Sequence, residues 1–118
     1  MLRTMLKSKI HGATVTESNL EYKGSITVDH DLMDATDLIP NEKVQVVNLN
    51  TGSRLETYVI PGEKGSGIIG MNGGAARYAA VGDKILIMAY AMLETKDAIT
   101  YVPKVIFVGD KNKTIDKK

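Results

Sequence analysis

Residues Lys43–Ile60 read KVQVVNLNTGSRLETYVI, and this stretch decides the fold class. Residues 43–49 and 54–60 are two runs rich in β-branched and apolar residues, which is typical of strands. Asn50-Thr51-Gly52 lies between them and has the composition of a hairpin turn. The stretch therefore predicts two antiparallel strands joined by a tight turn.

The rest of the chain repeats this pattern of short apolar runs separated by turn residues. Further strands are predicted at Met1–Leu6, Ile10–Thr16, Ser25–Val28, Lys84–Met92 and Lys104–Val108. The run at 84–92, KILIMAYAM, is apolar enough to be buried on both faces. Helical turns are expected only at 31–38, 75–80 and 94–98, and the charged segment 110–118 is expected to fray. Many short strands with little helix predict a mainly β protein, closed or nearly closed into a barrel.

Composition limits the functions that this chain can have. It has 118 residues, enough for a single domain spanning 1–118, and its net charge of +1 gives no bulk attraction to nucleic acid or an anionic membrane. There is no cysteine, and two histidines are too few for a histidine-rich metal site, so no metal is expected. The N-terminus, MLRTMLKSKI, is too short and too charged for a signal peptide, which predicts a cytoplasmic protein.

The pair Gly24-Ser25, within EYKGSI, permits an unusual reaction, although such a pair is more commonly a turn before a strand. The serine hydroxyl can attack the carbonyl of the preceding residue and form an ester, and a glycine there leaves that carbonyl open. Elimination then releases the upstream chain, and loss of the amine leaves a pyruvoyl group on residue 25. Such a ketone can form a Schiff base with a substrate amine and act as an electron sink, as pyridoxal phosphate does elsewhere.

Several motifs together resemble one family. They are MLRTMLKSKIH, YKGS, NTGSRLETYVIPGEKGSG, NGGAA and VGDKILI, and they run in the family's order from Met1 to about Asn112. The chain in this respect resembles the pyruvoyl-dependent aspartate 1-decarboxylases. The resemblance implies a double-psi β-barrel and a precursor that cleaves itself into residues 1–24 and 25–118.

The resemblance also implies the activity. A pyruvoyl group made from Ser25 would be the cofactor, with no metal and no pyridoxal phosphate, and L-aspartate would yield β-alanine and CO2 for pantothenate and coenzyme A. The family forms homotetramers with active sites between subunits. Whether cleavage is spontaneous or needs a maturation factor stays open.

Three residues of the predicted second hairpin strand match functional positions of that family. Tyr58 matches its proton donor, a role that suits a tyrosine hydroxyl acting as a general acid. Thr57 matches a residue that takes part in self-cleavage and in the site, where its hydroxyl would stabilise the oxyanion on Gly24. Arg54 matches the residue that binds a substrate carboxylate, and a guanidinium suits this task. We expect it to hold the side-chain carboxylate, because clamping the departing one would stabilise the ground state. On the sequence pattern alone, Tyr58 and Thr57 could be ordinary strand residues, and Arg54 could be a solvated arginine just after the hairpin turn.

The resemblance adds two further groups of residues. Lys9 would supply positive charge for a dicarboxylate, and His11 on the same strand face is a further candidate; alternatively they are a solvated lysine and a partly buried histidine. The other group would bind substrate through the backbone or an amide, and it consists of Asn72, Gly73, Gly74 and Ala75.

Two features do not fit simply. Arg54 and Tyr58 would share a strand face about 13 Å apart, too far for one aspartate to touch both. Either that strand is irregular, or the two residues serve different copies of the site. In addition, Gly12 stands where the family usually has a basic residue, which puts any charge role at that point in doubt.

Two other functions stay open on sequence grounds. One is a small β-barrel binding module, which would have no reason to cut itself. The other is a pyruvoyl enzyme acting on another acidic amino acid such as glutamate, because one methylene is discriminated only modestly by packing.

Overall fold

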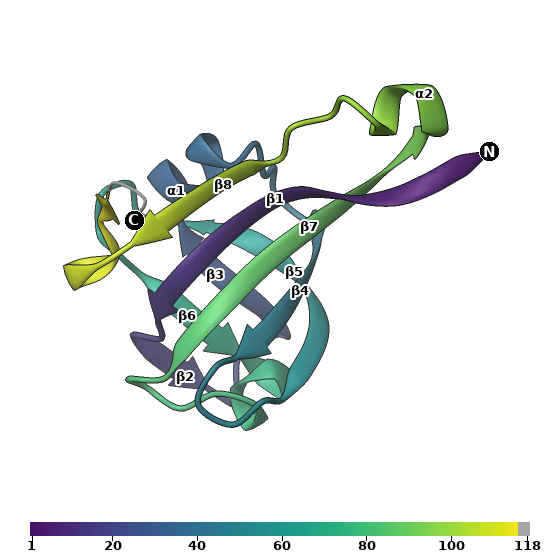
Figure 1. The fold of residues 1–118 in the computed structure, drawn as a ribbon. Coiled ribbons are helices and arrows are strands. Elements are labelled where there is room, and N and C mark those ends of the chain that lie inside the picture. The colour runs from purple at the N-terminus through teal and green to yellow at the C-terminus, as the bar shows by residue number, and fades with distance from the viewer. Residues whose placement is uncertain (116–118) are drawn as a thin grey trace.

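The computed structural model describes residues 1–115, which form one nine-stranded sheet in the order β2-β6-β3-β5-β4-β7-β1-β8-β9 (Figure 1). Its strands are β1 Leu2–Thr14, β2 Glu17–Asn19, β3 Ser25–Asp29, β4 Lys43–Asn48, β5 Arg54–Gly62, β6 Ile69–Asn72, β7 Lys84–Glu94, β8 Lys104–Val108 and β9 Thr114–Ile115. The short helical elements are α1 His30–Ala35, η1 Gly73–Arg77, α2 Thr95–Ala98 and η2 Asp110–Asn112.

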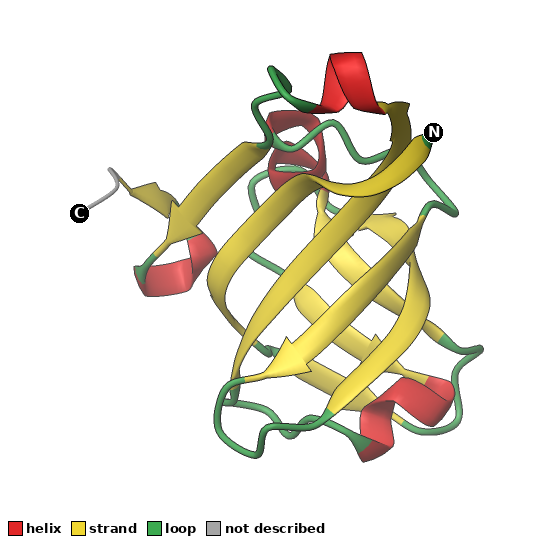
Figure 2. Ribbon diagram, turned by 45° about the vertical axis from the view of Figure 1, so that its right-hand side comes forward, coloured by secondary structure: helices red, strands yellow, loops and turns green. Residues whose placement is uncertain are grey.

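The sheet curls around a single core, and the ribbon shows a barrel with its helices at the ends and edges (Figure 2). Fully buried branched and methionine side chains fill its interior, including Ile10, Ile26, Met33, Val46, Val59, Ile69, Met71, Ile85 and Ile87. Past β1 the chain joins β6, where the Thr16 N–H donates to the Ile69 carbonyl oxygen (2.8 Å). Curling in this way leaves few unpaired edges. The arrangement is mainly β with a few short helices and fits a double-psi β-barrel, as predicted.

The predicted hairpin is confirmed. β4 and β5 are antiparallel, with Lys43 opposite Tyr58 and Val47 opposite Arg54. The side chain of Asn48 closes the turn, because its Oδ1 accepts hydrogen bonds from the backbone N–H groups of Asn50 and Thr51.

The first two predicted strands are in fact one. β1 runs without a break from Leu2 to Thr14, and the polar residues that suggested a gap are accommodated within it. Ser8 is buried, and the Lys7 ammonium reaches Glu42 at 2.7 Å. The pairing of β1 with β7 shifts register twice along this strand, and one shift is at Gly12, which has φ +84°. That positive φ explains a glycine at this position, because other residues adopt it at a cost.

The expectation that 84–92 is buried on both faces is wrong. β7 alternates, with Ile85, Ile87 and Ala89 facing the core, while Tyr90 is 43% and Met92 62% exposed. Its outer face is therefore apolar and open to solvent. In Figure 1 the ends of β1 and β7 near α2 project beyond the barrel.

The expectation of a frayed segment at 110–118 is wrong for its first six residues. These residues form η2 and β9, and β9 pairs with β8. The anchor is Asn112, whose buried side chain donates to the carbonyl oxygens of Thr14 (2.9 Å) and Gly67 (2.7 Å). Residues 116–118 lie outside the described residues. Within 1–115, no helix is both long and apolar enough to cross a membrane.

Candidate active site

Ser25 is the first residue of β3 and has a buried side chain, only 1% exposed, although the preceding Gly24 is exposed. Strand β3 lies between β5 and β6, and Ser25 is opposite Asn72 of β6. The Asn72 side-chain nitrogen donates to Ser25 Oγ at 2.9 Å and to Thr27 Oγ1 at 2.9 Å. The serine hydroxyl is therefore removed from bulk water and held from one side, while the peptide bond before it is accessible.

Gly73 lies directly against the segment that precedes Ser25. It has φ +60°, and a Cβ placed on it would lie 2.7 Å from both the Gly24 nitrogen and the Tyr22 carbonyl oxygen. Only a glycine fits this contact without displacing backbone. The adjoining Gly74 is exposed with open space around it, whereas Ala75 is buried. The structure thus brings Asn72 and Gly73 next to the Gly24-Ser25 step, and Gly74 and Ala75 follow directly in η1.

Strand β5 places two more predicted residues beside this step. β3 and β5 are parallel, with Ile26 opposite Val59. This is the first pair of the ladder, so Tyr58 immediately precedes it on β5 and Ser25 immediately precedes it on β3. Tyr58 is 39% exposed and Thr57 is half-buried, so the phenol is accessible to a small molecule at the barrel surface. Their roles in catalysis and cleavage stay predictions.

Arg54 lies elsewhere. The β4–β5 ladder is regular from Tyr58 to Arg54 without a register shift, so the alternative of an irregular strand is wrong. Four residues of regular strand separate the two side chains by about 13 Å. Arg54 is exposed at the far end of β5, and within one chain it is not beside Ser25.

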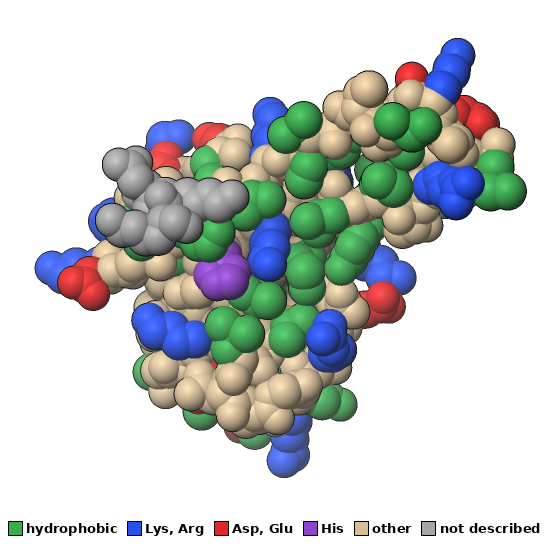
Figure 3. Space-filling view, in the orientation of Figure 1, with side chains coloured by type: hydrophobic (Ala, Val, Ile, Leu, Met, Phe, Trp, Pro, Cys, Tyr) green, Lys and Arg blue, Asp and Glu red, His purple; other side chains and the backbone are tan. Residues whose placement is uncertain are grey.

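Lys9 and His11 are also remote from Ser25 within one chain. They lie on β1, whose ladder partners are β7 and β8. The His11 ring packs on Phe107 with a centroid separation of 4.8 Å. Burial lowers the pKa of the His11 imidazole, and the positive charge of Lys9 lowers it further, so both favour the neutral ring. Figure 3 shows hydrophobic side chains gathered on the face over β1, β7 and β8.

The sequence reasoning missed Thr27. It is two residues beyond Ser25, so both side chains are on one side of β3, and both accept a hydrogen bond from Asn72. The available signal was this i, i+2 spacing of two hydroxyls. For a metal, residues 1–115 contain no group of three histidine or carboxylate side chains placed to bind one.

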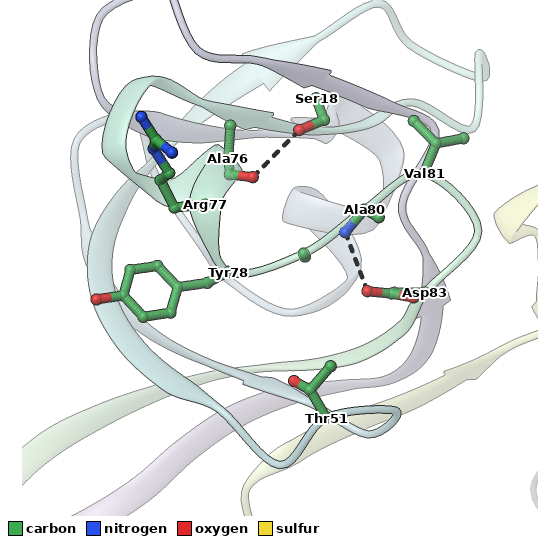
Figure 4. Close-up of a pocket in the computed structure, with 9 residues that line it drawn as sticks. Ser18, Thr51, Ala76, Arg77, Tyr78, Ala80, Val81 and Asp83 are labelled. Carbon is green, nitrogen blue, oxygen red and sulfur yellow. Dashed lines mark hydrogen bonds between the residues drawn. The ribbon is translucent and has the colours of Figure 1, made fainter.

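A hollow of about 380 Å³ lies beyond η1, between β2 and the turn after β4 (Figure 4). Arg77, Tyr78 and Asp83 contribute to its lining, but none of the predicted site residues does. The Asp83 carboxylate already accepts hydrogen bonds from Asn48 and the Ala80 backbone N–H. These bonds lower the pKa of Asp83 and give it a structural role at the barrel end.

Fold and site together define a small double-psi β-barrel that buries a strand-initial serine behind an exposed glycine. Comparison with known proteins gives the family. The family described as aspartate decarboxylase matches residues 1–115. The chain is 59% identical over 118 residues to the aspartate 1-decarboxylase of Carboxydothermus hydrogenoformans, covering 100% of this chain and 93% of that one. It is 56% identical over 113 residues to that of Bacillus subtilis, covering 96% and 89%. The chain therefore belongs to the aspartate decarboxylase family, and it is a carboxy-lyase.

Proposed function

We propose that this chain is a precursor that cleaves itself between Gly24 and Ser25 and then converts L-aspartate into β-alanine and CO2. One observation carries the proposal: in a member of this family, the Ser25 hydroxyl is buried and hydrogen-bonded to Asn72, directly after an exposed glycine. The hydroxyl is thus held in a fixed position next to an accessible peptide bond, which is the arrangement that attack on the Gly24 carbonyl requires.

The atoms of cleavage and of pyruvoyl formation balance with this chain and one water molecule. Ser25 Oγ adds to the Gly24 carbonyl carbon, the Gly24–Ser25 C–N bond breaks, and the freed amine takes the hydroxyl proton, which gives an ester. Elimination removes the Cα proton of residue 25 and breaks its Cβ–Oγ bond, so the oxygen leaves as part of the new Gly24 carboxylate and a Cα=Cβ double bond remains on residue 25. Water then replaces the nitrogen of residue 25, ammonia leaves, and a pyruvoyl group remains.

The surrounding residues fit that group, because the Asn72 side-chain nitrogen points at residue 25 and could donate a hydrogen bond there. When present, it supplies an electrophilic ketone and an electron sink for decarboxylation. Tyr58, which directly precedes the β5 partner of Ile26 and is partly exposed, would deliver the proton to the carbon that loses CO2. Thr57, the residue before it, would hydrogen-bond the Gly24 oxygen during cleavage.

A second subunit would complete the site, and we propose the homotetramer that the family resemblance implies. Arg54 and Lys9 lie away from Ser25 within one chain, yet a dicarboxylate needs cations. The outer face of β1, β7 and β8 is apolar where Lys9 and His11 lie, with Val105 39% and Tyr90 43% exposed. Covering this face with a neighbouring subunit would remove apolar surface from water. A cytoplasmic location belongs to the same proposal, because β-alanine for coenzyme A is used there.

The intact mass of the purified protein under denaturing conditions tests the cleavage. Scaling the 12.8 kDa chain by length predicts pieces of roughly 2.6 and 10.2 kDa. The larger piece should be roughly 17 Da lighter than one that begins with serine, because a pyruvoyl end has lost ammonia. A single species near 12.8 kDa, unchanged by warm incubation and by cell extract, would overturn the proposal. Cleavage only with extract would identify a requirement for a maturation factor.

The substrate is tested separately on the cleaved protein. With aspartate and glutamate at equal concentration, we expect β-alanine release to exceed 4-aminobutanoate release. The reverse ratio would keep the pyruvoyl chemistry and replace aspartate as the substrate.

A further inference from the structure

We propose that Thr27 is a positioning residue for self-cleavage: its hydroxyl oxygen anchors the Asn72 amide, which in turn holds Ser25 Oγ. This inference rests on the proposed function and adds a residue that positions the Ser25 hydroxyl for maturation. Thr27 does not touch the scissile bond, so it acts through Asn72.

The hydrogen-bond geometry is a fork. An amide nitrogen carries two hydrogens, and Asn72 directs them to Ser25 Oγ and Thr27 Oγ1, both at 2.9 Å. These are ordinary lengths for strong N–H···O bonds. An amide held by one bond alone can turn about its last torsion, whose energy well is broad. The second bond, to Thr27, removes that freedom.

Thr27 is itself held in place by two glycines on the neighbouring strands. A Cβ on Gly62 of β5 would lie 2.9 Å from the Thr27 methyl carbon, and one on Gly70 of β6 would lie 3.4 Å from its Cβ. The methyl group therefore packs against the bare backbone of Gly62, and the hydroxyl is left on the side of Asn72. Threonine has few χ1 choices, so this packing sets where the hydroxyl oxygen lies.

The fork matters in the first cleavage step. There Ser25 Oγ adds to the Gly24 carbonyl carbon while the peptide C–N bond breaks and its nitrogen takes the hydroxyl proton. A serine side chain that rotates freely is seldom aligned for that attack, and holding its oxygen raises the aligned fraction. Elimination later removes this oxygen with the Gly24 carboxylate. After maturation the fork has lost one of its two acceptors, so its positioning effect ends.

The test follows the cleavage rate of precursor made by cell-free translation, using denaturing mass spectrometry. Thr27→Val keeps the shape and removes the hydroxyl, and we expect cleavage about tenfold slower, the effect of losing one aligned buried hydrogen bond. Thr27→Ser keeps the hydroxyl and should restore the rate to within about threefold of wild type. The matched control is Thr36→Val, which removes a buried hydroxyl bonded to the Leu32 carbonyl oxygen (2.7 Å) at the end of α1. Its cleavage rate should equal that of wild type.

A double variant separates positioning from general destabilisation. If Thr27 acts through Asn72, Thr27→Val should cause no further slowing in an Asn72→Ala background. Equal cleavage of Thr27→Val and wild type would overturn the inference and leave the proposed function intact. So would equal slowing by Thr36→Val, or additive effects in the double variant. Absence of cleavage in wild type, even with cell extract, would instead overturn the proposed function.

Discussion

Replacing Gly73 by alanine should destabilise the uncleaved precursor more than the cleaved protein. The new methyl group would meet the Gly24 nitrogen and the Tyr22 carbonyl oxygen at 2.7 Å and the Gly24 Cα at 2.8 Å. All three are backbone atoms, so no side chain can turn aside to make room. The segment 22–24 must move, or η1 must.

Two contributions set the magnitude. Alanine at the left-handed φ of +60° costs about 1–2 kcal/mol. Forcing an extra carbon into a filled space costs a further 1–3 kcal/mol or so. Both costs apply to the precursor, so Gly73→Ala should lower its free energy of unfolding by roughly 2–5 kcal/mol in all. After cleavage Gly24 is a free chain end that can swing away, so the mature protein bears only the backbone contribution.

The assay is urea unfolding at one protein concentration, in two forms of the protein. Ser25→Ala supplies a precursor that cannot cleave, and Gly73→Ala is added to it and also to the mature protein. The matched control is Gly74→Ala, where a Cβ would meet nothing within 4 Å. We expect this control to change stability by less than about 1 kcal/mol in either form. Equal losses from Gly73→Ala in precursor and mature protein would refute the steric reasoning, as would a precursor loss no larger than that of the control.

Three further predictions concern single side chains. Tyr58→Phe should cleave normally yet lose about 10²–10⁴-fold in kcat for β-alanine release, because the general acid is gone; unchanged kcat would assign proton delivery elsewhere. Asp29→Asn should lose about 1.5–3 kcal/mol of unfolding free energy at pH 7. Burial alone raises the pKa of Asp29, but hydrogen bonds from the backbone N–H groups of Gly67, Gly65 and Asp31 outweigh it and lower that pKa. The wild-type advantage should therefore be complete above about pH 4 and fade as pH falls through the lowered pKa; an advantage that persisted in acid would contradict this origin. Ser8→Ala should be neutral or about 1 kcal/mol more stable in urea unfolding, because Ser8 Oγ is buried without a hydrogen-bond partner among the described residues; a clear loss would reveal one.

Local patterns in the sequence predicted the parts of the fold that local interactions determine. The β4–β5 hairpin follows from its turn, where Asn48 bonds residues only two and three positions ahead. The helical turn at 94–98 and the strand at 104–108 are likewise found close to their predicted bounds. The turn and the helical turn depend on contacts within a few residues, whereas β8 pairs with the distant β1 and was recognised from its apolar composition alone.

The errors came from contacts between distant segments. The break between strands that was expected after Leu6 is absent, because Lys7 forms an ion pair with Glu42, 35 positions away. The tail is ordered because Asn112 bonds Thr14, 98 positions away, and Gly67, 45 positions away. A hydrophobicity pattern shows that a residue is polar, but it does not show whether the folded structure provides a buried hydrogen-bond or ion-pair partner for it.

The same limit applies to the site, and it explains why Thr27 was overlooked. Ser25 acquires its surroundings from β5 and β6, which join β3 only when the barrel closes. The sequence shows two hydroxyls on one side of β3, but Asn72, 47 positions beyond Ser25, is what links them. The regular β5 ladder extends this argument past the single chain, because it keeps Arg54 about 13 Å from Tyr58. Under the proposed function, one barrel would present the cleavage site and Tyr58 as proton donor, and a second barrel would supply the cation that a dicarboxylate requires.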